Sequence, residues 1–169
     1  SLHDALPIYY CELTGLYWAW KNLECDYLGL VHYRRYFTSK SQAYREEINM
    51  DSIILSKSEV EKMMLDYDVV VPCKRKYYIE TLYSHYEHTH DGAHLDVTRQ
   101  IISELNPDYI DTFDKVMKQR SGYMFNMFIM SKDNVAAYCE WLFPIVDELY
   151  RRIDIEGYSA FDARLFGRV

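Results

Sequence analysis

Three short apolar runs constrain the fold of this chain more than any other feature. They lie at Tyr27–Tyr33, Asp68–Pro72 and Tyr123–Met130, and segments with helical periodicity separate them. The runs are rich in β-branched and aromatic residues and lack strict alternation of apolar and polar positions, which predicts buried strands. Strands that alternate with helices indicate an α/β fold whose sheet is covered on both faces.

Apolar residues at helical spacing predict the helices between these strands. The segment Glu12–Asn22 places Leu13, Leu16, Tyr17 and Trp20 on one face. Ser58 and Glu61 have the spacing of a capping box, which predicts a helix over Ser58–Leu65. The remaining helices are predicted over Tyr78–His90, Leu95–Leu105, Asp108–Gln119 and Asp133–Ile153, and from Ser159 onward.

Composition excludes several classes of protein. With 49% hydrophobic residues the chain is not a disordered one, and a net charge of −7 without a compensating Lys/Arg tract disfavours nucleic-acid binding. No apolar run approaches the ~20 residues of a membrane-spanning helix. The four cysteines form no C-x-x-C pair, which disfavours structural zinc and a disulfide scaffold, so we expect buried or half-buried thiols. The 17 tyrosines suit either sugar-stacking surfaces or half-buried core edges.

Both ends of the chain are expected to be cut ends. Residues Ser1–Ile8 lack the basic start and the cleavage site of a signal peptide, so we interpret them as an artefact or an unstructured leader. The folded part is then a partial domain over residues 9–169, and the last residues, Phe166–Val169, stop without a capping or tail sequence.

The sharpest chemical signal is His32-Tyr33-Arg34-Arg35 at the end of the first apolar run. In open α/β sheets, ligands bind outside the carboxyl ends of strands. Guanidinium groups match phosphate oxygens bidentately, so Arg34 and Arg35 are candidates to bind a diphosphate. The alternative is that they form surface ion pairs with some of the 26 acidic residues.

Two weaker patterns suggest metal binding. Asp66-Tyr67-Asp68 spells D-x-D, which can hold Mg²⁺ or Mn²⁺ on a nucleotide diphosphate, but it precedes an apolar strand instead of following one. Four histidines with helical spacings could chelate a transition metal or simply form a polar face: His85, His88, His90 and His94. No P-loop, G-x-G-x-x-G or G-x-S-x-G motif is present.

Two long motifs carry a resemblance to a known family. They are Tyr10–Asn22 (YCELTGLYWAWKN) and Asp26–Phe37 (DYLGLVHYRRYF), with further matching parts at Asp68–Pro72, His90–Asp96 and Asn126–Met130. From about Tyr9 to Val169 the chain resembles bacterial capsular or exopolysaccharide biosynthesis proteins. These are glycosyltransferases long catalogued as a domain of unknown function.

The resemblance implies a GT-A-like fold, the Rossmann-like three-layer sandwich of nucleotide-diphospho-sugar transferases, here truncated at both ends. The implied enzyme is hexosyltransferase-like. It would move a sugar from UDP-hexose or UDP-galactofuranose to a growing capsular polysaccharide, exopolysaccharide or lipid-linked glycan. The implied location is the cytoplasm, at the inner face of the plasma membrane with peripheral membrane association. Whether this fragment is itself active stays open.

The resemblance also suggests how the donor is bound. It places the strand Tyr27–Tyr33 where a GT-A enzyme would end in its metal-binding D-x-D. Here the strand ends in His32, Tyr33, Arg34 and Arg35, so we expect cationic side chains to neutralise the leaving diphosphate in place of a metal. No cofactor is then expected. The alternative is Mn²⁺ or Mg²⁺, with Asp66 and Asp68 as weak ligand candidates.

An inverting transferase needs a carboxylate or histidine near the acceptor hydroxyl, and the candidates are Asp96, Asp91 and His90. Asp96 could equally be an acid that stabilises the first turn of its helix. Tyr86 and Trp18 are candidates to stack on sugar rings. Asn126 would face the donor sugar or satisfy a buried backbone group. The alternatives to an enzyme are a non-catalytic carbohydrate-binding or scaffold module and a histidine-rich metal-binding regulatory domain.

Overall fold

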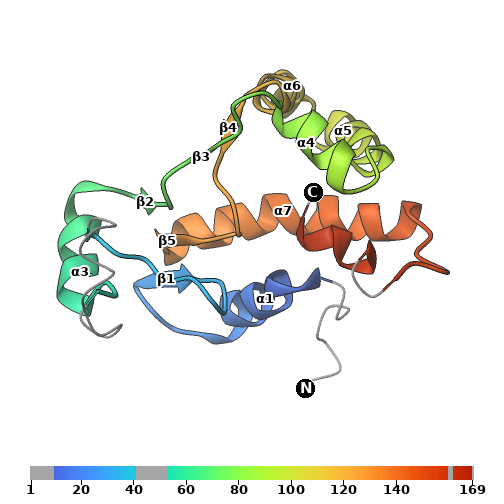
Figure 1. Ribbon diagram of the computed structural model, residues 1–169. Helices are drawn as coiled ribbons and strands as arrows, with labels where there is room; N and C mark the ends of the chain where they lie inside the picture. Colours follow the sequence, from blue (N-terminus) through green and yellow to red (C-terminus); the bar gives the residue numbers. More distant parts are fainter. Residues whose placement is uncertain (1–9, 41–52, 160–161, 169) are drawn as a thin grey trace.

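The computed structural model describes residues 10–40, 53–159 and 162–168 (Figure 1). The expected leader Ser1–Ile8 lies outside these residues. The elements, in which η marks a 3₁₀ helix, are α1 (Glu12–Asn22), β1 (Tyr27–Leu30), α3 (Lys57–Asp66), β2 (Val69–Val70), β3 (Arg75–Lys76), α4 (Leu82–Thr89), α5 (Ala93–Leu105), η4 (Pro107–Tyr109), α6 (Ile110–Met117), β4 (Ser121–Gly122), β5 (Phe128–Ser131), α7 (Lys132–Arg152) and η5 (Asp162–Gly167). Helices and strands are interspersed along the chain, in agreement with the predicted α/β class.

The main sheet has the order β1–β5–β2, and β5 is antiparallel to both neighbours. Leu30 lies opposite Phe128 on one side of β5, and Val70 lies opposite Ile129 on the other. Strands β1 and β2 therefore run in the same direction. Their carboxyl ends meet at the edge of the sheet where β5 begins.

The prediction of a sheet covered on both faces holds only for the central strand. Phe128 and Ile129 of β5 are both buried, whereas β1 buries Leu28 and exposes Tyr27 and Gly29. An antiparallel sheet can keep one face in water, because no crossover helix has to cover it. The short apolar runs thus predicted the strands and overstated their burial.

Helix α7 lies at the centre of the hydrophobic core and contacts α1, α5 and η5 (Figure 1). It continues through Pro144, and residues predicted on its apolar face, such as Val135, Val146 and Leu149, are buried. The ring of Trp20 stacks on Phe143 with centroids 6.0 Å apart, which supports a packing role for Trp20. The helices with long apolar stripes are therefore found where the periodicity predicted them.

The predicted third strand is shorter than its apolar run. Tyr123–Met127 are not part of β5, because Phe125 and Asn126 have φ values of 76° and 52°. These values lie in the left-handed region, which a strand cannot contain. The chain therefore bends sharply just before β5 begins.

The predicted capping box at Ser58 and Glu61 was wrong. Ser56 caps α3 instead: its hydroxyl accepts a hydrogen bond from Glu59 N, and the Glu59 carboxylate accepts one from Ser56 N at 2.9 Å. Both pairs have the same sequence spacing, and the pair at the true start of the helix forms the box.

Composition predicted buried or half-buried thiols and no apolar run long enough for a membrane-spanning helix. Cys139 is buried and Cys11 is half-buried, but Cys25 and Cys73 are exposed, so the expectation for the thiols was wrong for those two. No helix in the described part of the chain is both long and apolar enough to cross a membrane.

Candidate functional site

The residues His32–Arg35 form a tight turn after β1, here called the basic turn. Arg35 N donates to the His32 carbonyl at 2.9 Å, and His32 Nδ1 lies 3.2 Å from the Arg35 guanidinium. That guanidinium sits 3.7 Å above the centroid of the Phe125 ring, a cation–π contact that fixes its position. Arg34 lies over the ring of Tyr33 in the same manner, at 4.8 Å.

Within the described part of the chain, the two arginines of the basic turn are not neutralised by carboxylates. Among residues 10–40, 53–159 and 162–168, no carboxylate forms an ion pair with Arg34 or Arg35. The nearest acidic contact is from Glu12, whose carboxylate lies 3.7 Å from His32 Nε2. Among the described residues, then, no carboxylate fulfils the alternative prediction of surface ion pairs for these two arginines.

Phe125 and Asn126 form the bend that precedes β5, and the Phe125 ring contacts Arg35 of the basic turn. A bulky residue at positive φ costs of order 1–3 kcal/mol, and such conformations cluster at functional sites. The Asn126 side chain donates to the Gly167 carbonyl at 2.9 Å, so it satisfies a backbone group, one of its two predicted roles. A Cβ on Gly167 would come within 3.3 Å of the Tyr10 carbonyl oxygen, which shows how closely η5 approaches the start of α1.

The topology separates the basic turn from the D-x-D sequence. The basic turn follows β1 and the Phe125–Asn126 bend precedes β5, so both lie at one edge of the sheet. Asp66 and Asp68 precede β2 and lie at the opposite edge, where Asn134 of α7 donates to the Asp68 carbonyl at 3.3 Å. The sheet thus stands between these carboxylates and the arginines.

A cavity of about 280 Å³ lies between the α4–α5 corner and the C-terminal segment. Tyrosine, histidine and acidic side chains line much of it: Tyr86, His90, Asp91, His94, Tyr158 and Asp162, with Gly157, Ser159 and Leu165 completing the wall. We call it the Tyr–His cavity.

His94 lies in the wall of the Tyr–His cavity and is only 5% exposed. Its Nδ1 lies 3.3 Å from the Tyr86 hydroxyl, and its Nε2 lies 3.3 Å from the Tyr158 hydroxyl. Burial lowers the pKa of His94 and raises the pKa of Tyr86, which favours the neutral form of both groups.

The cavity brings together three of the residues predicted to act on the acceptor or to bind sugar, namely His90, Asp91 and Tyr86. Burial, followed by the positive charge of Arg168, lowers the pKa of His90, so its imidazole is neutral near pH 7 and can accept a proton. The Asp91 carboxylate accepts a hydrogen bond from Ala93 N at 2.9 Å at the start of α5.

Two other predicted residues lie outside the lining of the cavity. Asp96 is exposed in the first turn of α5 and accepts a hydrogen bond from the Tyr83 hydroxyl at 2.9 Å. Trp18 lies on the exposed side of α1. The structure therefore groups His90 with Asp91 and leaves Asp96 and Trp18 apart from them.

Sequence reasoning missed the contribution of the C-terminal segment. Tyr158, Ser159 and Asp162 line the cavity, and the Ser159 hydroxyl donates to the Asp162 carboxylate at 2.6 Å. No local pattern in the sequence indicates that this segment packs against α4 and α5. The same segment links the Tyr–His cavity to the Phe125–Asn126 bend beside the basic turn. Its helix η5 contributes Asp162 to the cavity and Gly167 to the bond with Asn126.

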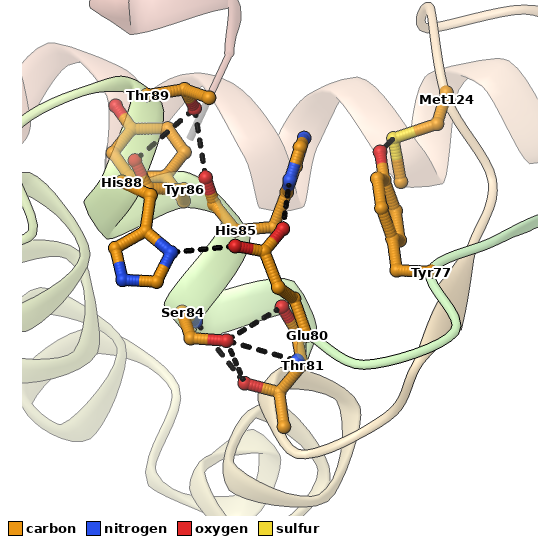
Figure 2. Close-up of polar contacts among 9 residues, drawn as sticks. All are labelled: Tyr77, Glu80, Thr81, Ser84, His85, Tyr86, His88, Thr89 and Met124. Atoms are coloured by element: carbon orange, nitrogen blue, oxygen red, sulfur yellow. Dashed lines mark hydrogen bonds and ion pairs between the residues drawn. The ribbon is translucent and has the colours of Figure 1, made fainter.

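The other two histidines of the predicted cluster, His85 and His88, lie around Glu80 (Figure 2). The Glu80 carboxylate lies 2.7 Å from His85 Nδ1 and 2.5 Å from His88 Nδ1, and hydrogen bonds from these two side chains lower its pKa. The predicted histidine cluster is thus divided between Glu80 and the cavity. Within the residues that the structure describes, no three His, Cys, Asp or Glu side chains gather as a metal site.

Comparisons with known proteins place the chain in a family. The model of a family described as "Domain of unknown function (DUF4422)" matches residues 6–169. The apo structure of the WbbM bifunctional glycosyltransferase matches with a TM-score of 0.81 at 28% sequence identity, over 97% of this chain and 33% of that chain. The chain therefore spans about a third of that protein and shares its fold there. No curated protein matches.

Proposed function

The chain belongs to the DUF4422 family, and on that premise we propose that it is part of a glycosyltransferase. The observation that carries the proposal is the likeness to the WbbM glycosyltransferase structure along almost the whole of this chain. We extend the proposal to a three-layer, GT-A-like arrangement in the complete enzyme. The basic turn and the Tyr–His cavity would then be two parts of one active site, linked by η5.

We assign the basic turn to the donor, a nucleotide-diphosphate sugar such as UDP-hexose or UDP-galactofuranose. The Arg34 and Arg35 guanidinium groups would bind the diphosphate oxygens, with His32 and Tyr33 holding the turn in shape. As the bond between the sugar C1 and the phosphate oxygen breaks, negative charge builds on the leaving UDP. Fixed cations at that point stabilise the transition state more than the ground state, which is how they accelerate transfer.

We assign the Tyr–His cavity to the acceptor. His90 is proposed as the general base: its neutral imidazole would take the proton of the acceptor hydroxyl while that oxygen bonds to the sugar C1. Asp91 lies in the same wall and is the second candidate, whereas Asp96 would need a change of structure to reach the cavity. Tyr86 and Tyr158 offer hydroxyl groups for sugar recognition, and Asn126 would position η5 beside the donor.

The biological setting is likewise a proposal. The acceptor would be a growing capsular polysaccharide, an exopolysaccharide or a lipid-linked glycan. The reaction would take place in the cytoplasm at the inner face of the plasma membrane, with the protein peripherally associated. We propose that no metal cofactor is needed, because the two guanidinium groups supply the charge that Mn²⁺ or Mg²⁺ supplies elsewhere.

The direct test measures UDP binding by calorimetry and release of UDP from UDP-glucose, UDP-galactose and UDP-galactofuranose. Arg35→Ala should lower the transfer rate by about 10²-fold or more, because it removes a charge that acts in the transition state. Arg151→Ala is the matched control, since Arg151 is an exposed arginine paired with Glu148 on α7. A protein that binds glycans but neither binds nor turns over UDP-sugars would be the non-catalytic carbohydrate-binding module.

A further inference from the structure

The segment Lys74–Ile79 displays two large apolar side chains beside three consecutive cations. Tyr78 is 89% exposed and Ile79 is 87% exposed, the two highest values among the large hydrophobic residues of the described chain. Single exposed apolar residues are ordinary on a protein surface. Two adjacent ones next to basic residues form a pattern typical of surfaces that enter the headgroup region of a membrane.

The cations at this place stand out against the acidic charge of the whole chain. Lys74, Arg75, Lys76 and Arg120 are all exposed, and in the described part of the chain none of them forms an ion pair. The neighbouring carboxylate of Glu80 is engaged elsewhere, because it lies between His85 and His88 (Figure 2). A local positive surface therefore exists on a protein of net charge −7.

The two-stranded ribbon β3–β4 holds this surface in place (Figure 1). Arg75 pairs with Gly122 and Lys76 with Ser121, and Tyr77 N donates to the Arg120 carbonyl at 2.7 Å. The Tyr77 side chain is turned inward, with its ring 4.2 Å from that of His85 and its hydroxyl bonded to Met124 (Figure 2). With Tyr77 anchored, Tyr78 and Ile79 are left outside.

We propose that this ribbon, Lys74–Ile79 with Arg120, docks the protein on an anionic lipid bilayer. The cations would face the phosphates of anionic lipids, while Tyr78 and Ile79 enter the boundary between headgroups and acyl chains. Lys74 follows β2, whose carboxyl end lies at the same edge of the sheet as the basic turn. The ribbon therefore leaves the sheet at the edge that carries the basic turn. The inference specifies the membrane association proposed above and does not depend on glycosyl transfer.

The test is co-sedimentation with vesicles of phosphatidylcholine alone or mixed with phosphatidylglycerol, with no sugar present. We expect binding to the mixed vesicles only, and loss of binding at high salt. The double variant Lys74→Gln/Lys76→Gln should bind roughly 25-fold more weakly, at about fivefold per cation. Tyr78→Ser/Ile79→Ser should also reduce binding by about tenfold or more, because two apolar side chains no longer enter the bilayer.

Matched controls come from α3 and the residue after it. Lys57→Gln/Lys62→Gln removes two exposed lysines, and Leu65→Ser/Tyr67→Ser removes two exposed apolar side chains, 83% and 64% exposed. These controls should bind as the parent protein does, and equal thermal unfolding of all variants would show that each folds. No binding, equal binding to pure phosphatidylcholine, or equal loss in the controls would overturn the proposal. Because the assay contains no donor, its outcome is separate from that of the UDP-sugar test.

Discussion

At the scale of single residues, Asn126 has a backbone conformation that explains its identity. Its φ of 52° lies in the left-handed region, where Asn and Gly are the best tolerated residues, and its side chain bonds to Gly167. Sequence reasoning singled out Asn126 as a polar residue in an apolar run. It could not foresee the bend, because the run reads as a strand when only side-chain polarity is considered.

Substitutions at Asn126 separate two contributions to stability, namely its hydrogen bond to Gly167 and its tolerance of a left-handed backbone. Asn126→Gly keeps the backbone conformation and loses the hydrogen bond to Gly167, so we expect the free energy of unfolding to fall by about 1 kcal/mol. Asn126→Ala loses the same hydrogen bond, and unlike glycine it has a Cβ at positive φ without the polar side chain that makes asparagine tolerated there, so it should be roughly 1–2 kcal/mol less stable than the glycine variant. Urea unfolding of both variants measures the difference. If the Ala variant were as stable as the Gly variant, residue 126 would not have a left-handed backbone conformation.

The histidines of the Tyr–His cavity predict how stability depends on pH. Burial lowers the folded-state pKa of both His94 and His90, while the charges of Asp91 and Asp162 act in the opposite direction on His94. In the unfolded chain both groups titrate near their ordinary value of about 6.5. As the pH falls below that value the unfolded state binds more protons than the folded state, so stability present above it is lost.

We therefore expect the free energy of unfolding to decrease between about pH 7 and pH 5, and His94→Gln to make that decrease smaller. Glutamine can keep a hydrogen bond to Tyr86 or Tyr158 but does not titrate. Urea unfolding at a series of pH values gives the slope for each protein. A slope that is the same in both proteins would mean that His94 is protonated equally in the folded and unfolded states.

At the scale of elements, the length of each helix or strand determined how well the sequence predicted it. Helices α1, α5 and α7 carry apolar residues over three or more turns, so their periodicity is unambiguous. Strands β2, β3 and β4 contain two residues each, and β3 and β4 were not predicted at all. Two residues cannot show a repeat, and the pairing of this ribbon depends on partners more than 40 positions apart.

The start of α3 gives a prediction that distinguishes two similar sequence signals. Ser56→Ala removes the hydroxyl that accepts from Glu59 N and should lower stability by about 1 kcal/mol. Ser58→Ala removes a hydroxyl inside the first turn whose contact is with Ser56 Oγ at 3.1 Å, and should cost much less. Thermal unfolding followed by circular dichroism compares the two. The reverse order of effects would restore Ser58 as the capping residue.

At the scale of the whole molecule, the direction of the strands determines which side chains can act together. The sequence predicted the strands but contained no information on their pairing, because an apolar run is compatible with parallel and antiparallel neighbours alike. With β5 antiparallel to β1 and β2, the basic turn and the Phe125–Asn126 bend share one edge of the sheet. The close packing of η5 against the start of α1 and its bond to Asn126 then join that edge to the Tyr–His cavity, a relationship that only long-range contacts create.

The same topology yields a prediction about metal dependence. Asp66 and Asp68 lie at the opposite edge of the sheet from Arg34 and Arg35, so a cation held by these carboxylates would be separated from a diphosphate on the basic turn. If the arginines stabilise the leaving diphosphate, the rate of transfer from a UDP-sugar should be unchanged by EDTA. It should also be unchanged in the variant Asp66→Asn/Asp68→Asn, whereas Arg35→Ala loses about 10²-fold.

The measurement is the initial rate of UDP release from the UDP-sugar that the protein accepts, after dialysis against EDTA and again after Mn²⁺ or Mg²⁺ is added. Loss of activity that Mn²⁺ restores would refute the cationic replacement of the metal. If the double asparagine variant lost activity in the same assay, Asp66 and Asp68 would be the metal ligands. The charge that stabilises the leaving group would then come from the edge of the sheet that precedes β2, and the basic turn would serve only to bind the donor.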